Sequence, residues 1–154
     1  MTIIALGINH KTASVELREK VAFSPEQMSE ALQQLSGHAD FNEAVIVSTC
    51  NRTEIYCSLA ERNSQTLLRW LAGFHGLDEH ELSNNTYYHE GDKAINHLMR
   101  VSCGLDSLVL GEPQILGQIK QAYHNAKTHD AIGVTFDRLF QKTFSVAKQV
   151  RTET

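Results

Sequence analysis

The sequence predicts an α+β fold in which helices pack on a small and mainly antiparallel sheet. Over the first two thirds of the chain, short apolar runs and helical patterns follow the order strand, helix, strand, strand, helix, strand. This order favours an α/β sandwich with helices on one face of the sheet. The last third shows helical spacing alone. With 154 residues, the chain is long enough for one domain with a substantial core.

The first strand and the first helix carry clear local signals. Residues 3–8 are an apolar run that ends in the polar stretch 9–12, which we expect to face the same side of the sheet as the turn at Cys50. Residues 24–27 read Ser-Pro-Glu-Gln, with a Ser cap, Pro at the first helical position and Gln three residues after the cap. Apolar residues at helical spacing follow, and Gly37 ends this helix.

Two buried strands, residues 45–47 and 55–59, flank a polar turn that holds Cys50 and Arg52. A thiolate is a nucleophile, and a neighbouring cation lowers the pKa of a thiol. Cys50 is therefore a candidate nucleophile that needs no metal.

The alternative is structural. Cysteine at the end of a strand is often a small apolar filler, and Arg52 can pair with Glu54 or Glu43 on the surface. A plain hairpin, however, needs only one or two turn residues and no arginine beside a thiol. The run Thr-Cys-Asn-Arg at 49–52 therefore favours the functional interpretation of Cys50.

Later segments predict a helix from Ser64 to about His75, a short helix at 78–82 and a strand at 86–89. From Asp92 an apolar arc at helical spacing runs to Leu105, and His97 lies at its border. His97 is either a flanking side chain that half-buries its ring or a neutral imidazole that faces the site.

Two further helices are expected, one from Pro113 to about Lys127 and one over residues 134–154. In the helix that starts at Pro113, the face opposite the apolar one carries Gln114, Gln118 and Gln121. These glutamines form either a solvated face or, because Gly117 removes bulk beside Gln118, a surface that a ligand approaches closely.

Composition narrows the class of protein. Apolar residues make up 42% of the chain, charged residues 21%, and the net charge is −4. This total does not predict a strongly basic surface, although it leaves room for a local basic patch. No stretch approaches the length of a transmembrane helix, no signal peptide pattern is present, and three cysteines without CxxC spacing indicate a reducing, cytoplasmic location. We expect no metal site, because the eight histidines are scattered, and no GxGxxG signature for a dinucleotide is present.

Three stretches together resemble one known family, glutamyl-tRNA reductase. They are LGINHKT at residues 6–12, STCNRTE at 48–54 and GLDSLVLGEPQILGQ at 104–118. The resemblance covers the whole chain and implies that residues 1–132 form the catalytic domain and residues 133–154 begin a long connecting helix. It also implies a truncated chain that lacks the NADPH-binding and dimerisation domains of the family.

The resemblance further implies a reaction, in which Cys50 attacks the ester of glutamyl-tRNA and forms a glutamyl thioester. NADPH then reduces the thioester to glutamate-1-semialdehyde, the first committed step of five-carbon tetrapyrrole and haem synthesis. Thr49, Asn51 and Arg52 would line the glutamate pocket, with Arg52 on the side-chain carboxylate. His97 matches a histidine important for activity. The other substrate-contacting positions would be Ser107, Glu112, Pro113, Gln114 and Gln118, with Glu112 near the α-ammonium group.

The implied partners are glutamyl-tRNA, the aminomutase that takes up the aldehyde, and a second subunit in the homodimer of the full enzyme, with no membrane association. Two alternatives of different class stay open at this point. The chain is a tRNA- or protein-binding module with a structural Cys50, or it is an esterase with a Cys50–His97 dyad.

Overall fold

A four-stranded sheet lies at the centre of the computed structural model, which describes residues 2–60, 64–105 and 114–153. The strand order is β2-β3-β1-β4, and each neighbouring pair is antiparallel. The predicted α+β fold with an antiparallel sheet is therefore confirmed. The strands are β1 (Thr2–Asn9), β2 (Phe41–Ser48), β3 (Arg52–Leu59) and β4 (Tyr87–Glu90).

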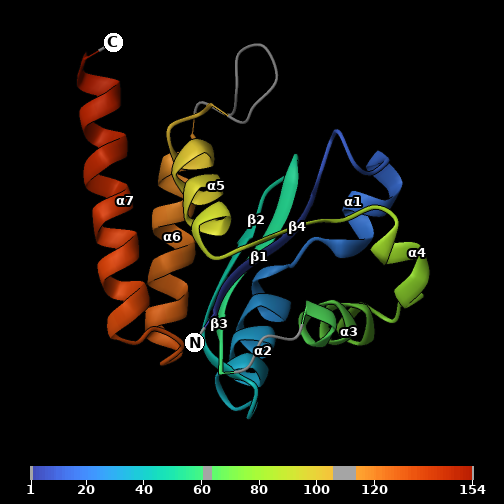
Figure 1. The fold of residues 1–154 in the computed structure, drawn as a ribbon. Helices are drawn as coiled ribbons and strands as arrows, with labels where there is room; N and C mark the ends of the chain where they lie inside the picture. Colours follow the sequence, from blue (N-terminus) through green and yellow to red (C-terminus); the bar gives the residue numbers. More distant parts are fainter. Residues whose placement is uncertain (1, 61–63, 106–113, 154) are drawn as a thin grey trace.

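Helices cover both faces of this sheet (Figure 1). The helices of the first two thirds lie on one side, as predicted, with α4 beyond α3. They are α1 (Val15–Val21), α2 (Pro25–Ser36), α3 (Ser64–His75) and α4 (Glu79–Ser83). The helices of the last third lie on the opposite side, and they are α5 (Asp92–Ser102), α6 (Ile115–Thr128) and α7 (Val134–Glu153). All eight residues of β3 are buried, as expected for a strand covered from both sides.

The face of β3 that meets α5 and α7 is polar although it is buried. Side chains alternate along a strand, so Arg52, Glu54 and Tyr56 point to the same side. Tyr56 packs edge-on against Phe140 of α7, and Glu54 contacts His97 of α5. A row of charged and hydroxyl groups is thereby enclosed between the sheet and the helices of the last third.

The long helix α7 is tied to the sheet by its first turn. Glu43 of β2 accepts a hydrogen bond through Oε1 from the backbone N–H of Phe136 (3.1 Å) and another through Oε2 from the hydroxyl of Ser58 (3.3 Å). Phe136 and Phe140 have no exposed surface. The helix that the family resemblance assigns to a connecting segment is therefore, over its first turns, part of the core.

The structure differs from the sequence prediction at three places. Ser48 and residues 52–54, expected in the polar turn, belong to β2 and β3, whose pairing continues up to the turn. Helix α1 was not predicted, because its seven residues are too few to show apolar periodicity; Ser14 caps it by accepting from the N–H of Leu17. The apolar arc expected to reach Leu105 ends earlier, at Ser102, where Gly104 with φ of +78° turns the chain and leaves Leu105 63% exposed. Within the described residues, no helix has the length and apolar character that crossing a membrane requires.

Candidate active site

Cys50 lies at the tip of the turn between β2 and β3, and the turn is held by the side chain of Thr49. Thr49 Oγ1 accepts hydrogen bonds from the backbone N–H groups of Asn51 and Arg52, both at 3.2 Å. The N–H of Thr49 in turn donates to the carbonyl oxygen of Arg52 (2.8 Å). These bonds fix the backbone on both sides of Cys50. They also engage the amides of Thr49, Asn51 and Arg52 within the turn, so these three amides do not form an oxyanion hole.

The base of the turn is anchored to the helical layer behind it. Ser48 Oγ accepts from the backbone N–H of Phe23 at 3.0 Å and lies 3.4 Å from the hydroxyl oxygen of Thr53. Phe23 belongs to the segment between α1 and α2, so the turn is connected to that segment as well as to its own strands. A fixed turn presents the thiol in one place, as a nucleophile requires.

The three thiols of the chain differ in accessibility. Cys50 is exposed, Cys103 is half-buried and Cys57 is buried in the sheet. Burial raises the pKa of Cys57, so its thiolate is scarce at neutral pH. Cys50 is therefore the thiol that an external electrophile reaches.

The carboxylate of Glu54, two residues after Arg52 in β3, is completely buried and contacts four polar side chains. The hydroxyl of Tyr56 donates to Oε1 at 2.8 Å. The hydroxyl of Tyr87 and the guanidinium Nη1 of Arg52, the latter at 3.3 Å, both donate to Oε2, and His97 Nε2 makes a short contact with the same oxygen. Arg52 is itself 1% exposed, so its pairing with Glu54 is a buried ion pair and not a surface one.

The partners of Glu54 decide its charge. Burial alone raises the pKa of this carboxyl group, but the hydrogen bond and charge of His97, the charge of Arg52 and the hydrogen bond from Tyr87 outweigh that effect. The pKa of Glu54 is lowered, and the group is an anion at neutral pH. Burial and the neighbouring Glu54 charge raise the pKa of Tyr56 well above its usual value, so its hydroxyl remains a donor.

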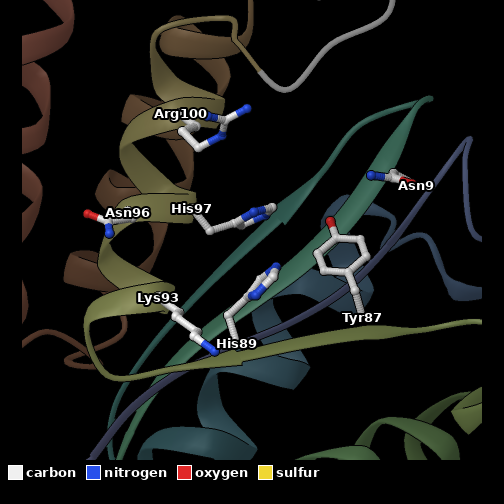
Figure 2. Close-up of a pocket in the computed structure, with 7 residues that line it drawn as sticks. All are labelled: Asn9, Tyr87, His89, Lys93, Asn96, His97 and Arg100. Carbon is white, nitrogen blue, oxygen red and sulfur yellow. The ribbon is translucent and has the colours of Figure 1, made fainter.

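A cavity of about 380 Å³ opens between β4 and α5 beside this network. Figure 2 shows His89 and Tyr87 rising from β4 toward His97, which reaches across from α5. The ring centroids of His89 and His97 are 4.6 Å apart, and those of Tyr87 and His97 are 5.2 Å apart. The lining residues are Asn9, Tyr87, His89, Lys93, Asn96, His97 and Arg100.

The cavity adjoins the Cys50 turn through the sheet. Asn9 lines the cavity and lies opposite Arg52 in the β1–β3 register, and Arg52 follows Cys50 by two residues. With about 5 Å between neighbouring strands and about 3.3 Å per residue, the Cα atom of Asn9 lies roughly 10 Å from that of Cys50. The predicted position of the polar end of β1 on the side of the Cys50 turn is confirmed.

Comparison with known proteins gives the relationship of this chain. The family model described as "Glutamyl-tRNAGlu reductase, N-terminal domain" matches residues 6–154. The chain belongs to this family. The predicted resemblance to the glutamyl-tRNA reductases over the whole chain is therefore confirmed for residues 6–154.

Individual glutamyl-tRNA reductases support the assignment. The chain is 88% identical to the glutamyl-tRNA reductase of Pseudoalteromonas translucida and 59% identical to that of Photobacterium profundum, in each case over 100% of the chain and 37% of the relative. The structure of glutamyl-tRNA reductase from Methanopyrus kandleri matches with a TM-score of 0.77 at 29% identity, over 99% of the chain and 35% of that protein. The chain thus spans little more than a third of the length of these reductases.

Those predicted site residues that the structure describes fall into three groups. His97 and Arg52 meet at Glu54, and His97 also lines the cavity. Cys50, Thr49 and Asn51 form the turn above Arg52. The helix carrying the predicted glutamines begins at Ile115; Gln114 and Gln118 are exposed there, and a Cβ at Gly117 would meet open space. The predicted residues Ser107, Glu112 and Pro113 lie outside the described residues.

Sequence reasoning missed most of the cavity. Tyr87 and His89 come from a strand that was predicted without a functional role, and Glu54 was considered only as a surface partner of Arg52. One signal was present in the sequence. Lys93, Asn96, His97 and Arg100 are spaced three or four residues apart, which places them along one side of the helix that was correctly predicted from Asp92.

Proposed function

We propose that this chain carries out the acyl-transfer half of the glutamyl-tRNA reductase reaction, with Cys50 as the nucleophile. The observation that carries the proposal is the exposed thiol at the tip of a turn that Thr49 and Ser48 hold in place. The match of the family model over residues 6–154 supplies the substrate class, glutamyl-tRNA.

The proposed step forms one bond and breaks another. The Sγ thiolate of Cys50 attacks the carbonyl carbon of the ester that joins glutamate to the terminal ribose, and a C–S bond forms. The bond from that carbon to the ribose oxygen breaks, and the oxygen leaves with the tRNA after taking up a proton. The product is a glutamyl thioester, which is more electrophilic toward hydride than the ester or a free carboxylate. Covalent capture thereby divides a difficult reduction into two easier steps.

The neighbours of Cys50 have separate proposed roles. We retain Arg52 as the proposed partner for the side-chain carboxylate of the substrate on the basis of the resemblance alone, since its guanidinium is buried here and pairs with Glu54. Asn51, half-buried beside Cys50, is proposed to contact the same group on the basis of the resemblance. Thr49 acts through the backbone, because its hydroxyl oxygen accepts from two amides of the turn.

His97 and Glu54 form the second part of the proposed site. Glu54 holds His97 by Nε2, which fixes the orientation of the imidazole at the wall of the cavity. Among the described residues, no hydrogen bond joins His97 to Cys50, so the geometry favours a positioned imidazole in the substrate cavity over a Cys50–His97 esterase dyad. We retain Ser107, Glu112, Pro113, Gln114 and Gln118 as proposed substrate contacts on the basis of the resemblance alone.

NADPH is the reductant that the family implies, and the described part of the chain does not show the usual site for it. The described strands pair only in antiparallel fashion, and the sequence contains no GxGxxG signature, whereas a Rossmann-type dinucleotide site needs a parallel βαβ unit. We therefore place NADPH binding outside this chain and derive no step through it. For the complete enzyme we propose a homodimer, transfer of the aldehyde to the aminomutase, a cytoplasmic location and a connecting role for residues 133–154.

Mass spectrometry tests the acyl-transfer step directly. Brief exposure of the chain to glutamyl-tRNA, followed by acid quenching and proteolysis, is expected to give a glutamyl adduct on the peptide that contains Cys50. The Cys50→Ser variant is expected to give no thioester, and Cys103→Ser is the matched control that retains it. No adduct on the unmodified chain, or an adduct on Cys103 instead, would overturn the proposal. No semialdehyde is expected when NADPH is added to the chain alone, and its formation would overturn our placement of the NADPH site.

Alkylation separates the enzyme from a binding module in which Cys50 is structural. Iodoacetamide is expected to modify Cys50 before Cys103, and Cys103 before Cys57, because reactivity follows thiolate content and access. Equal rates at Cys50 and Cys57 would favour the binding module.

A further inference from the structure

Two basic side chains, Lys93 and Arg100, line the cavity between β4 and α5 beside the imidazoles of His89 and His97. Among the described residues, no carboxylate lines this cavity. Within the described part of the chain, neither Lys93 nor Arg100 has an acidic side chain within ion-pair distance. In a protein with a net charge of −4, this is a local basic patch with the character of an anion site.

The two cations lie along one side of α5, with aromatic rings between them. Seven residues make almost two helical turns, so Lys93 and Arg100 face the same direction about 10 Å apart. His97 and His89, with ring planes 32° apart, occupy the space between these two levels (Figure 2). Cations that follow a backbone, together with ring faces on which bases stack, are the means by which proteins bind single-stranded nucleic acids.

The direction of α5 relative to the Cys50 turn orders the two cations. His97 is fixed to Glu54, which lies two residues from Arg52 on β3. Arg100 is one turn beyond His97, toward the C-terminal end of α5, and Lys93 is one turn before His97, at the N-terminal end and farther from Asn9 (Figure 2). A nucleotide chain that starts at the thiol therefore reaches Arg100 first and Lys93 second.

We propose that this cavity binds the sugar–phosphate backbone of the single-stranded acceptor end of glutamyl-tRNA. Arg100 receives the phosphate of the terminal nucleotide, whose ribose carries the ester, and Lys93 receives the phosphate of the nucleotide before it. The proposal rests on the function proposed above and adds the subsite and direction of the RNA. It accounts for a basic cavity at the end of the sheet that carries an exposed thiol, in a chain that is acidic overall.

Substrates with different numbers of phosphates test this assignment through thioester formation on Cys50. Glutamyl-adenosine has none, glutamyl-adenosine 5′-monophosphate has one, and a 5′-phosphorylated glutamyl-cytidylyl-adenosine has two. Arg100→Ala is expected to lower kcat/KM about tenfold for the substrates with one or two phosphates but not for glutamyl-adenosine. Lys93→Ala is expected to lower kcat/KM only for the substrate with two phosphates. With glutamyl-tRNA, each variant is expected to flatten the dependence of log kcat/KM on log salt by about 0.7.

Control variants each remove one Lys or Arg charge from the helices on the opposite side of the sheet. Lys20→Ala on α1 and Arg69→Ala on α3 are expected to leave all substrates and the salt slope unchanged, and Arg100→Lys is expected to restore most of the loss at Arg100. Equal penalties on glutamyl-adenosine and on the phosphorylated substrates would overturn the proposal, since they would indicate a distorted site. Unchanged salt slopes with glutamyl-tRNA would overturn it as well.

NADPH also carries phosphates and could occupy a basic cavity, but thioester formation does not use it. If both variants form the thioester normally and instead raise the KM for NADPH in the complete reductase, the cavity belongs to NADPH and the proposal is wrong. If the unmodified chain forms no thioester, the proposed function fails by itself. The RNA-binding proposal is then tested by the affinity of RNA with the sequence of the acceptor end but without glutamate. This affinity is expected to fall in Arg100→Ala and Lys93→Ala, and an unchanged affinity would overturn the proposal.

Discussion

The hydroxyl of Tyr87 reaches the carboxylate of Glu54 by passing directly over Gly7. β1 lies between β4 and β3, and Gly7 is the residue of β1 that is opposite both Tyr87 and Glu54. A Cβ at Gly7 would lie 2.7 Å from Tyr87 Oη and 2.9 Å from Glu54 Cγ. The residue at position 7 therefore has to be glycine because a hydrogen bond between two strands crosses the space that a side chain would fill.

The first prediction concerns Gly7→Ala. The added methyl group is expected to displace the Tyr87 ring and break its bond to Glu54, lowering the free energy of unfolding by about 1–3 kcal/mol. Urea denaturation measures this as a lower midpoint. Because both changes remove the same bond, Tyr87→Phe in the Gly7→Ala background is expected to cost less than Tyr87→Phe alone.

Gly73 provides the control for Gly7. It lies inside α3, and a Cβ there would meet no atom within 4 Å. Gly73→Ala is expected to raise the free energy of unfolding by about 0.5–1 kcal/mol, since alanine is the better helix former. Equal effects of the two substitutions would show that Gly7 is not restricted by Tyr87.

The second prediction uses the pH dependence of Glu54. Its pKa in the folded protein is below the ordinary value of 4.5, so its contribution to stability is complete above that pH and is lost as the pH falls through the folded-state pKa. Glu54→Gln leaves Arg52 buried without its anion and is expected to cost about 3–5 kcal/mol at pH 7. The difference from the unmodified chain is expected to narrow below pH 4.5.

Denaturation curves between pH 7 and pH 3 measure this difference. Glu19→Gln, a change on the exposed side of α1, is the control and is expected to have little effect at any pH. A gap between Glu54→Gln and the unmodified chain that stays constant down to pH 3 would contradict the lowered pKa.

Local signals predicted most of the elements. The capping box at Ser24 is present as predicted: its hydroxyl oxygen accepts from the N–H of Gln27, and the Gln27 side chain accepts from the N–H of Ser24. Such contacts span three residues, so the sequence contains both partners side by side. The apolar runs that became β1, β2 and β3 were equally clear, whereas α1 was too short to show a period.

The buried network around Glu54 could not be predicted from the sequence, for a different reason. Arg52, Glu54, Tyr56 and Ser58 alternate with less polar residues along β3, a pattern typical of a strand with one face in water. Here the helices of the last third cover that face, and the partner of Glu54 on α5 is 43 residues away in the sequence. The exposed position of Cys50 depends on the local turn, which lies within the predicted polar stretch 48–54, although only residues 49–51 of that stretch lie between the two strands.

The third prediction concerns the attachment of α7 to the sheet. Glu43 Oε1 accepts from the N–H of Phe136, one of the amides at the start of α7 that has no acceptor within the helix. Glu43→Ala is expected to leave this amide and the Ser58 hydroxyl without a partner, at a cost of about 2–3 kcal/mol. Hydrogen exchange at the Phe136 amide is expected to accelerate. Glu19→Ala is the matched control, and unchanged exchange at Phe136 in Glu43→Ala would contradict the assignment.

The fourth prediction separates positioning by Thr49 from direct contact with the substrate. Thr49→Val keeps the shape of the side chain but removes the oxygen that accepts from the amides of Asn51 and Arg52. Thr49→Ser keeps that oxygen and loses only a methyl group. The turn is expected to loosen in Thr49→Val alone. Thioester formation with glutamyl-tRNA then falls at least tenfold in Thr49→Val through kcat, with KM little changed, because the thiol is misplaced while the binding cavity is intact.

A readout without substrate completes the test of Thr49. If Thr49 fixes the backbone, hydrogen exchange at the amides of Asn51 and Arg52 accelerates in Thr49→Val and stays slow in Thr49→Ser. If the hydroxyl instead contacts glutamate, exchange in the free protein is the same in both variants and the loss appears in KM. If Thr49 holds the backbone, its hydrogen bonds determine where the Cys50 thiol lies. Faster hydrogen exchange and a lower kcat for thioester formation must then appear together in Thr49→Val.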